Sequence, residues 1–179
     1  MPLEKIKKIL IVGIFITIIS SGVQVFSKNT QELSLTFFTL SLIGQCIFAL
    51  GLYHIDKIAK SPLSMHYISI VCMQFGIFIM GKIDVLNNQI AILILSLLLL
   101  FVMLRYLQIF TKVSGQIAFV HSFYLLIFCI LSGLCLLKLD RFIDSSSIVS
   151  FVIGFMILPP LIYYIIAVLD LKEIRIYSP

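Results

Sequence analysis

Six long apolar stretches, separated by short polar breaks, run through this sequence from end to end. Each is close to the roughly 20 residues that an α-helix needs to cross about 30 Å of hydrocarbon, at a rise of about 1.5 Å per residue. Only 12% of the 179 residues are charged, whereas a soluble domain carries about 25%. The pattern therefore predicts an all-α polytopic membrane protein with six transmembrane helices. The predicted spans are 9–26, 35–53, 63–80, 90–110, 117–137 and 148–169.

The polar breaks between these stretches are short. They leave no room for an extramembrane domain that would bind a nucleotide or a metal, so we expect a single transmembrane domain over residues 1–179. Lysines before the first apolar run resemble the start of a secretory signal. That run is long and five more follow it, so it is predicted to be a retained first helix.

Basic residues are distributed unevenly between the two sides of the predicted bundle. Nine lysines and arginines fall on the side of the termini and four on the other side, whereas the eight acidic residues divide evenly. The positive-inside rule then places both termini in the cytoplasm, and we expect the protein in the bacterial cytoplasmic (inner) membrane. Orientation and anionic headgroups account for the net charge of +5, so the lipid bilayer is the expected partner and no direct nucleic-acid partner is predicted. The tyrosines expected in the cytoplasmic headgroup layer are Tyr53, Tyr67, Tyr106 and Tyr177.

The six stretches look like three copies of one helical hairpin. In each copy, a lysine at the outer end of the first span is followed 24 or 25 residues later by a tyrosine near the inner end of the second. A true internal repeat and the shared topology of successive hairpins both explain this spacing. A repeat with an even number of spans does not invert, which argues against the inverted-repeat mechanism of many transporters. The three pairs are Lys28 and Tyr53, Lys82 and Tyr106, and Lys138 and Tyr163.

Two glutamines are the most deeply placed polar residues of the predicted spans. Gln45 and Gln74 lie near the middle of the second and third spans, and no Asp, Glu or Lys lies near a span centre. The absence of a central charge argues against a carboxylate-based proton or cation pump. A buried amide needs hydrogen-bond partners, so these glutamines either join helices to one another or line a small polar cavity.

The sixth span contains the most specific local irregularity of the chain. Pro159 and Pro160 lie near its centre, and neither can donate a backbone hydrogen bond. Carbonyl groups about one turn earlier then need other partners in hydrocarbon. The two prolines predict either a fixed kink that serves packing or a functional hinge.

Histidine and cysteine show no arrangement typical of a catalytic or metal site. His54, His66 and His121 lie near the predicted cytoplasmic ends of spans, and no haem-attachment motif accompanies them. The four cysteines all fall within spans, where cysteine behaves as a small apolar residue. We therefore predict no catalytic residue, no metal ligand and no cofactor, and a protein that is not an enzyme.

The predicted function is that of a non-enzymatic integral membrane subunit. It would form homo-oligomers, anchor a cytoplasmic protein partner, or do both, as a sensor of stress or of membrane state. The alternative is a small-solute transporter or channel lined by Gln45 and Gln74 and broken at Pro159 and Pro160. A haem-binding or intramembrane enzyme is a weaker alternative. The basic residues expected to contact a partner on the cytoplasmic face are Lys57, Lys60, Arg105, Lys112, Lys172 and Arg175.

Small residues in the spans permit close approach of helices, and this is the basis for expecting a homo-oligomer. The same residues would equally serve packing within one chain. They include Ser20, Gly44, Gly51 and Gly76.

Overall fold

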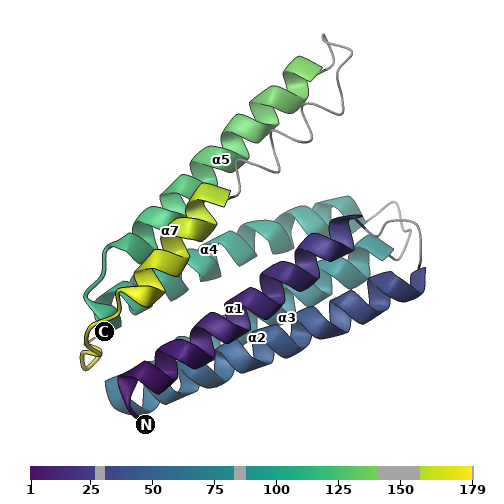
Figure 1. The fold of residues 1–179 in the computed structure, drawn as a ribbon. Helices are drawn as coiled ribbons and strands as arrows, with labels where there is room; N and C mark the ends of the chain where they lie inside the picture. The colour runs from purple at the N-terminus through teal and green to yellow at the C-terminus, as the bar shows by residue number, and fades with distance from the viewer. Residues whose placement is uncertain (27–30, 83–87, 141–157, 179) are drawn as a thin grey trace.

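The computed structural model describes residues 1–26, 31–82, 88–140 and 158–178, and within them the chain forms six α-helices and no strand. The prediction of an all-α chain is therefore confirmed for these residues. The helices are α1 (Leu3–Phe26), α2 (Gln31–Ala59), α3 (Leu63–Lys82), α4 (Asn88–Ser114), α5 (Ala118–Asp140) and α7 (Leu158–Leu169) (Figure 1).

The predicted boundaries of α2 and α4 were too short. Both helices continue past the last apolar residues, through His54 to Ala59 and through Thr111 to Ser114. Hydropathy falls where the side chains become polar, but a helix ends where its backbone is capped. Here the caps are Lys60, at φ 55°, and Gly115, at φ 69°, which stand in the left-handed conformation just after each helix.

Two helical segments, Phe38–Ala59 and Leu93–Ser114, are long and apolar enough to cross a membrane. Three other apolar segments are shorter within the described residues: Leu63–Ile77, Ala118–Ser132 and Leu158–Leu169. The first ten residues of the predicted sixth span, 148–157, lie outside the described part of the chain. The six-span topology therefore remains a prediction.

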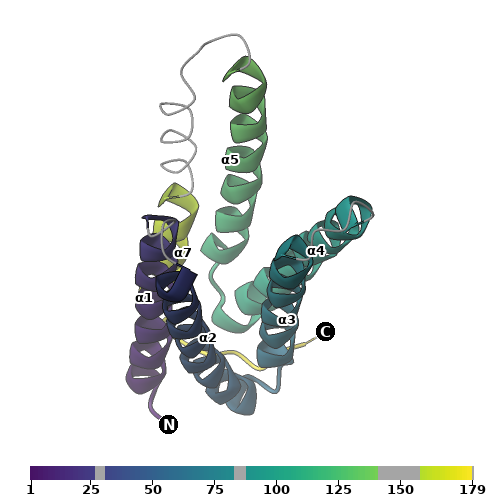
Figure 2. The same ribbon diagram turned by 90° about the vertical axis from the view of Figure 1, so that its right-hand side faces the viewer.

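The helices form a ring that converges at one end. Each helix contacts the next one in the chain order α1, α2, α3, α4, α5, α7, and α7 returns to contact α1. Contacts within the pairs α1–α2, α3–α4 and α5–α7 are more extensive than those between pairs. Figures 1 and 2 show the helices close together where both termini lie and splayed apart at the opposite end. We call these the closed end (residues 3–10, 52–66, 104–122 and 164–178) and the open end.

The buried core occupies the closed end. Its largest fully buried side chains include Leu10, Leu52, Phe110, Phe119 and Leu171, which come from four helices and the C-terminal segment. The rings of Phe110 and Phe119 stack with their centroids 4.0 Å apart and so join α4 to α5. The tight packing here fixes the distances between the helical turns that lie at the closed end.

Helices α1 and α2 touch through their backbones. A methyl group added at Gly13 would lie 2.7 Å from the backbone nitrogen of Phe48, and one at Gly44 would lie 2.8 Å from the backbone nitrogen of Thr17. Gly51 packs in the same way against the side chain of Leu10. Gly44 and Gly51 therefore serve packing within the chain. They no longer count as evidence for the expected homo-oligomer, which stays a prediction.

A carboxylate joins α2 to α3 at the closed end. Asp56, in the last turn of α2, accepts hydrogen bonds from the Ser61 hydroxyl at 2.6 Å and from the backbone nitrogens of Leu63 at 2.9 Å and Ser64 at 2.7 Å. These nitrogens begin α3, where a helix leaves donors unpaired and favours a negative charge. Asp56 thus sets the angle at which α3 leaves α2.

The segment after α7, residues 170–178, crosses the closed end, and we call it the C-terminal strap. The backbone nitrogen of Arg175 donates to the Val113 carbonyl, and that of Tyr177 donates to the Ala59 carbonyl, both at 2.7 Å. Leu171, near the start of the strap, is completely buried. The strap therefore joins the ends of α2 and α4 and closes this end of the ring.

Candidate functional site

A cavity of about 320 Å³ lies inside the ring, and all six helices line it. Each helix contributes two residues spaced three apart, which places both on one face, a turn from each other. These pairs are Ile14 and Thr17 of α1, Gln45 and Phe48 of α2, Tyr67 and Ile70 of α3, Met103 and Tyr106 of α4, Phe123 and Leu126 of α5, and Leu161 and Tyr164 of α7.

The side of the cavity nearest the closed end is aromatic. We name Phe48, Tyr67, Tyr106 and Tyr164 the aromatic floor. Ring centroids lie 4.8 Å apart for Phe48 and Tyr67, 5.8 Å for Tyr67 and Tyr106, and 6.4 Å for Phe48 and Tyr164. The hydroxyls of Tyr106 and Tyr164 are hydrogen-bonded at 2.9 Å, so that each of the four residues contacts two others of the floor. Four helices are thereby joined around one point.

The aromatic floor rests on the core of the closed end. Phe110 lies 5.9 Å from Tyr106, and Phe119 lies 5.4 Å from Tyr164, centroid to centroid. Both phenylalanines are fully buried. The cavity therefore extends from the floor away from the closed end.

The polar groups of the cavity differ in whether they already have partners. Thr17 and Ser122 donate their hydroxyl protons to carbonyls of their own helices, Gly13 at 2.9 Å and Phe119 at 2.7 Å. By contrast, the amides of Gln45 and Gln74 and the hydroxyl of Tyr67 make no hydrogen bond to any residue that the structure describes. These three groups are left with donors and acceptors for a molecule inside the cavity.

The cavity wall is otherwise apolar. Among the described residues, no charged side chain lines it. Arg105, which falls within the predicted fourth span, is exposed and shares the outward face of α4 with Leu97 and Phe101, which precede it at intervals of four residues. The cavity is therefore suited to an uncharged molecule, since a charge placed there would find no counter-ion.

Two of the four residues predicted as a polar lining or hinge, Gln45 and Gln74, both line the cavity. Pro160 also lines it and is buried, whereas Pro159 is exposed. Both prolines lie at the start of α7 as the structure describes it, directly after residues that lie outside the described part of the chain. The predicted kink concerns residues 148–157, which lie outside the described residues, so the hinge stays a prediction.

All six basic residues predicted to contact a partner lie at the closed end, where Arg105 is the most distant from the helix terminus, roughly two and a half turns before the end of α4. Lys57 stands over the ring of Tyr53 at 4.9 Å, and Lys112 over that of Tyr177 at 5.5 Å. The other three are Lys60 and Lys172, which are exposed, and Arg175, which pairs with Glu173.

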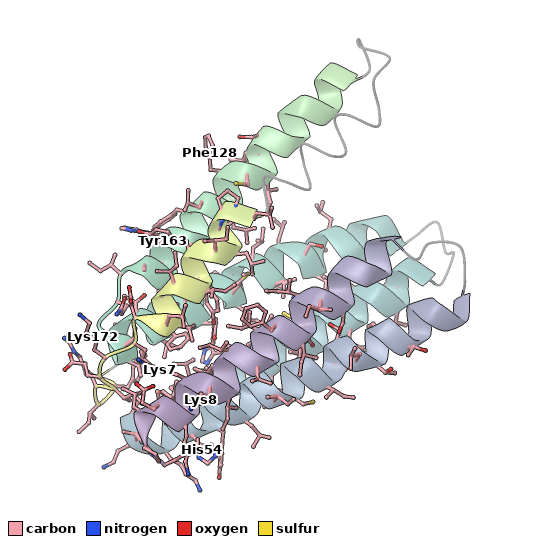
Figure 3. The ribbon with its side chains drawn as sticks, in the orientation of Figure 1. Lys7, Lys8, His54, Phe128, Tyr163 and Lys172 are labelled. Atoms are coloured by element: carbon pink, nitrogen blue, oxygen red, sulfur yellow. The ribbon has the colours of Figure 1, made fainter. Side chains whose placement is uncertain are left out.

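Other basic side chains join them at this end. Figure 3 shows Lys7, Lys8, His54 and Lys172 gathered at the closed end. Lys7 pairs with Glu4 at 3.4 Å. The gathering makes the closed end the basic end of the described molecule.

The histidines lie apart from one another. The Nδ1 atom of His66 lies 2.9 Å from the Pro62 carbonyl, and His54 packs beside Tyr53. His121 lines a shallow groove on the outside of α5 and α7, with Phe128 and Tyr163 (Figure 3). Within the described residues, no group of three or more His, Cys, Asp or Glu side chains could hold a metal ion.

The aromatic floor was not predicted from the sequence. Tyr67 and Tyr106 were predicted to lie in the headgroup layer, but both line the cavity, and Tyr106 is only 4% exposed. One signal was available: Phe48, Tyr106 and Tyr164 follow one another at equal intervals of 58 residues. The three residues each lie on the second helix of a predicted hairpin. The interval between them differs from the intervals between Lys28, Lys82 and Lys138.

Comparison with family models, with curated proteins and with solved structures finds no match. The function proposed below is therefore inferred from the geometry of the chain itself.

Proposed function

We propose that this chain is an integral membrane protein whose six helices cross the bilayer, and that it binds a small uncharged solute in the cavity of the ring. Both termini face the cytoplasm in this proposal, and binding serves carriage of the solute or sensing of its presence, without catalysis. The observation that carries the proposal is the cavity itself, to which every described helix contributes at least two residues.

The outer surface of the ring supports the membrane location. Only 33% and 22% of the apolar windows in the segments Phe38–Ala59 and Leu93–Ser114 are buried, and large apolar side chains such as Leu50 and Leu97 are exposed on them. A core helix of a soluble protein would be mostly buried. Large side chains are also exposed on other helices, such as Phe15 on α1 and Phe128 on α5. Apolar surface of this extent is stable in lipid and not in water.

The dimensions and chemistry of the cavity support solute binding. Its volume of about 320 Å³ lies at the lower end of the roughly 300–1,000 Å³ range of small-molecule sites. Such sites have mostly apolar walls and a few polar groups that orient the ligand. Gln45 and Gln74 provide such groups, and their unpaired amides favour a polar ligand atom over an empty apolar void.

The polarity of the ring supports a direction of access. The aromatic floor bounds the cavity on the side of the closed end, and the core and the C-terminal strap lie beyond the floor. The basic closed end is the cytoplasmic end in this proposal, because lysines and arginines favour that side. The solute therefore enters from the bilayer or from the outer side.

A second candidate function rests on the exposed basic residues of the closed end. Lys60 and Lys172 are exposed and have no ion-pair partner among the described residues. They favour a role in anchoring an acidic cytoplasmic protein. Pull-down with wild-type protein and with a Lys60→Glu, Lys172→Glu variant tests this role, since charge reversal would abolish a specific contact.

Solute binding is tested by filling the cavity. Met103→Trp places a larger side chain in the cavity, and Phe101→Trp makes a similar change on the outward face of the same helix. Both proteins are reconstituted in nanodiscs, and retention of neutral and charged small molecules is measured by equilibrium dialysis. We expect wild type and Phe101→Trp to retain neutral compounds that Met103→Trp loses. Equal retention by all three proteins would contradict the proposal.

The orientation is tested separately. In a cysteine-free background, Lys60→Cys should react with a membrane-impermeant thiol reagent only from the cytoplasmic side. Labelling of this site from the outer side of intact cells would reverse the proposed topology.

A further inference from the structure

We propose that the cavity takes a neutral, flat conjugated ring that carries a carbonyl oxygen. The ring lies against the aromatic floor, and the oxygen accepts hydrogen bonds from Gln45 and Tyr67. This inference rests on the proposed solute binding and specifies the chemical class of the solute.

The shape of the floor favours a flat guest. Four aromatic rings from four helices lie within 4.8–6.4 Å of their neighbours, and adjacent rings are tilted by 48° or 55°. A guest in the cavity therefore meets both ring faces and ring edges. Conjugated rings gain from both arrangements, because offset stacking and edge-to-face contact match the quadrupoles of the two π-systems.

The unpaired groups favour an acceptor on that guest. The Gln45 amide offers two N–H donors and the Tyr67 hydroxyl offers one, and neither donates to another described residue. The hydroxyl pair of Tyr106 and Tyr164 uses one of its two protons internally, so one proton remains. A carbonyl oxygen has two lone pairs and can accept from both Gln45 and Tyr67.

The volume limits the size of the ring system. A cavity of about 150 Å³ holds benzene, so about 320 Å³ accommodates one or two fused rings with a short substituent. It is too small for the two acyl chains of a phospholipid. The absence of a charged side chain in the described lining excludes an ionised guest.

The experiment uses four probes that differ in the carbonyl oxygen, the conjugated ring system or the charge. Acetylnaphthalene has the fused ring and the carbonyl, ethylnaphthalene lacks the oxygen, cyclohexyl methyl ketone lacks the conjugated ring, and naphthoate carries a charge. Dissociation constants are measured by equilibrium dialysis against full-length protein in nanodiscs, and retention by the Met103→Trp protein is subtracted as lipid partition. Phe101→Trp is the matched control and should bind as wild type does.

We expect acetylnaphthalene to bind about three- to tenfold more tightly than ethylnaphthalene, which is the range for a hydrogen bond to a neutral group. Gln45→Leu and Tyr67→Phe should each reduce this preference by at least half, and the double variant should bring the ratio to about one. Ethylnaphthalene binding should change less than acetylnaphthalene binding in these three variants, because ethylnaphthalene accepts no hydrogen bond from Gln45 or Tyr67.

Three results would overturn the inference, and they separate it from the proposed function. Equal affinity for acetylnaphthalene and ethylnaphthalene would rule out recognition of the carbonyl oxygen. Tighter binding of cyclohexyl methyl ketone than of acetylnaphthalene would rule out recognition of the conjugated ring. In both cases the proposed solute binding itself would still hold. Tight binding of naphthoate would exclude a neutral ligand. No specific retention of any probe would overturn the proposed function together with this inference.

Discussion

The two ends of the ring differ in how they are held together. At the closed end, the core is buried, Asp56 caps α3, and the C-terminal strap bonds to the ends of α2 and α4. At the open end, the helices diverge, and large apolar side chains such as Ile19 and Leu93 are exposed. The closed end therefore carries most of the buried core, the α1–α2 contact continues beyond it, and the cavity begins where the core stops. Stability and binding can then be changed by separate substitutions.

Gly44→Ala should have the largest effect. The new methyl group would lie 2.8 Å from the backbone nitrogen of Thr17 and 3.0 Å from the carbonyl of Gly13, and backbone atoms cannot rotate away as a side chain can. We expect α1 and α2 to be forced apart, with a loss of about 2–3 kcal/mol, measured as a lower unfolding temperature in mild detergent. Gly76→Ala is the control, because its methyl group would meet only a Leu95 side-chain carbon at 3.4 Å. Equal melting of the two variants would contradict the close α1–α2 contact.

Asp56→Ala tests the polar connection at the closed end. Its removal leaves the backbone nitrogens of Leu63 and Ser64 without their acceptor. We expect a loss of about 1–2 kcal/mol, as for other helix caps, again measured by thermal unfolding. Asp170→Ala, a change at an exposed carboxylate outside α7, should cost far less. A stable Asp56→Ala protein would show that α3 does not depend on this cap.

The tyrosine pair tests the boundary between the two regions. Tyr106→Phe leaves the buried Tyr164 hydroxyl without its partner, so we expect a cost of about 1 kcal/mol. Tyr164→Phe should cost a similar amount. The double variant should cost less than the sum of the two, because neither hydroxyl is then left unpaired. Additive losses in this double-mutant cycle would indicate that the hydroxyls do not interact.

The smallest effect is expected on the outside of the ring. Leu97→Ala removes a side chain that is 59% exposed on α4. We expect a change within about 0.5 kcal/mol and no change in solute binding. A large loss at this position would show that the outward face of α4 packs against another molecule, and it would support the predicted homo-oligomer.

Much of the fold follows from local properties of the chain. The lengths of the apolar stretches predicted six helical segments, and the mid-span amides Gln45 and Gln74, predicted either to join helices or to line a cavity, both line the cavity of the ring. The charge distribution also placed the basic residues at one end. What failed was the placement of Tyr67 and Tyr106, because a tyrosine near the end of an apolar stretch has the same sequence context whether it faces lipid or the ring interior.

The sequence by itself determined that the described part of the chain is helical, that it holds six helical segments, and which of their ends are basic. These properties depend on residue type and on distance along the chain. Only the tertiary structure decided which face of each helix turns inward. The apolar side chains of α1 and of α3 are distributed around all faces of each helix, so no apolar stripe identifies the face that is buried. That choice is made by close contacts between helices, such as Gly13 and Gly44 against α2 and α1, and they bring Phe48, Tyr106 and Tyr164 together around one cavity.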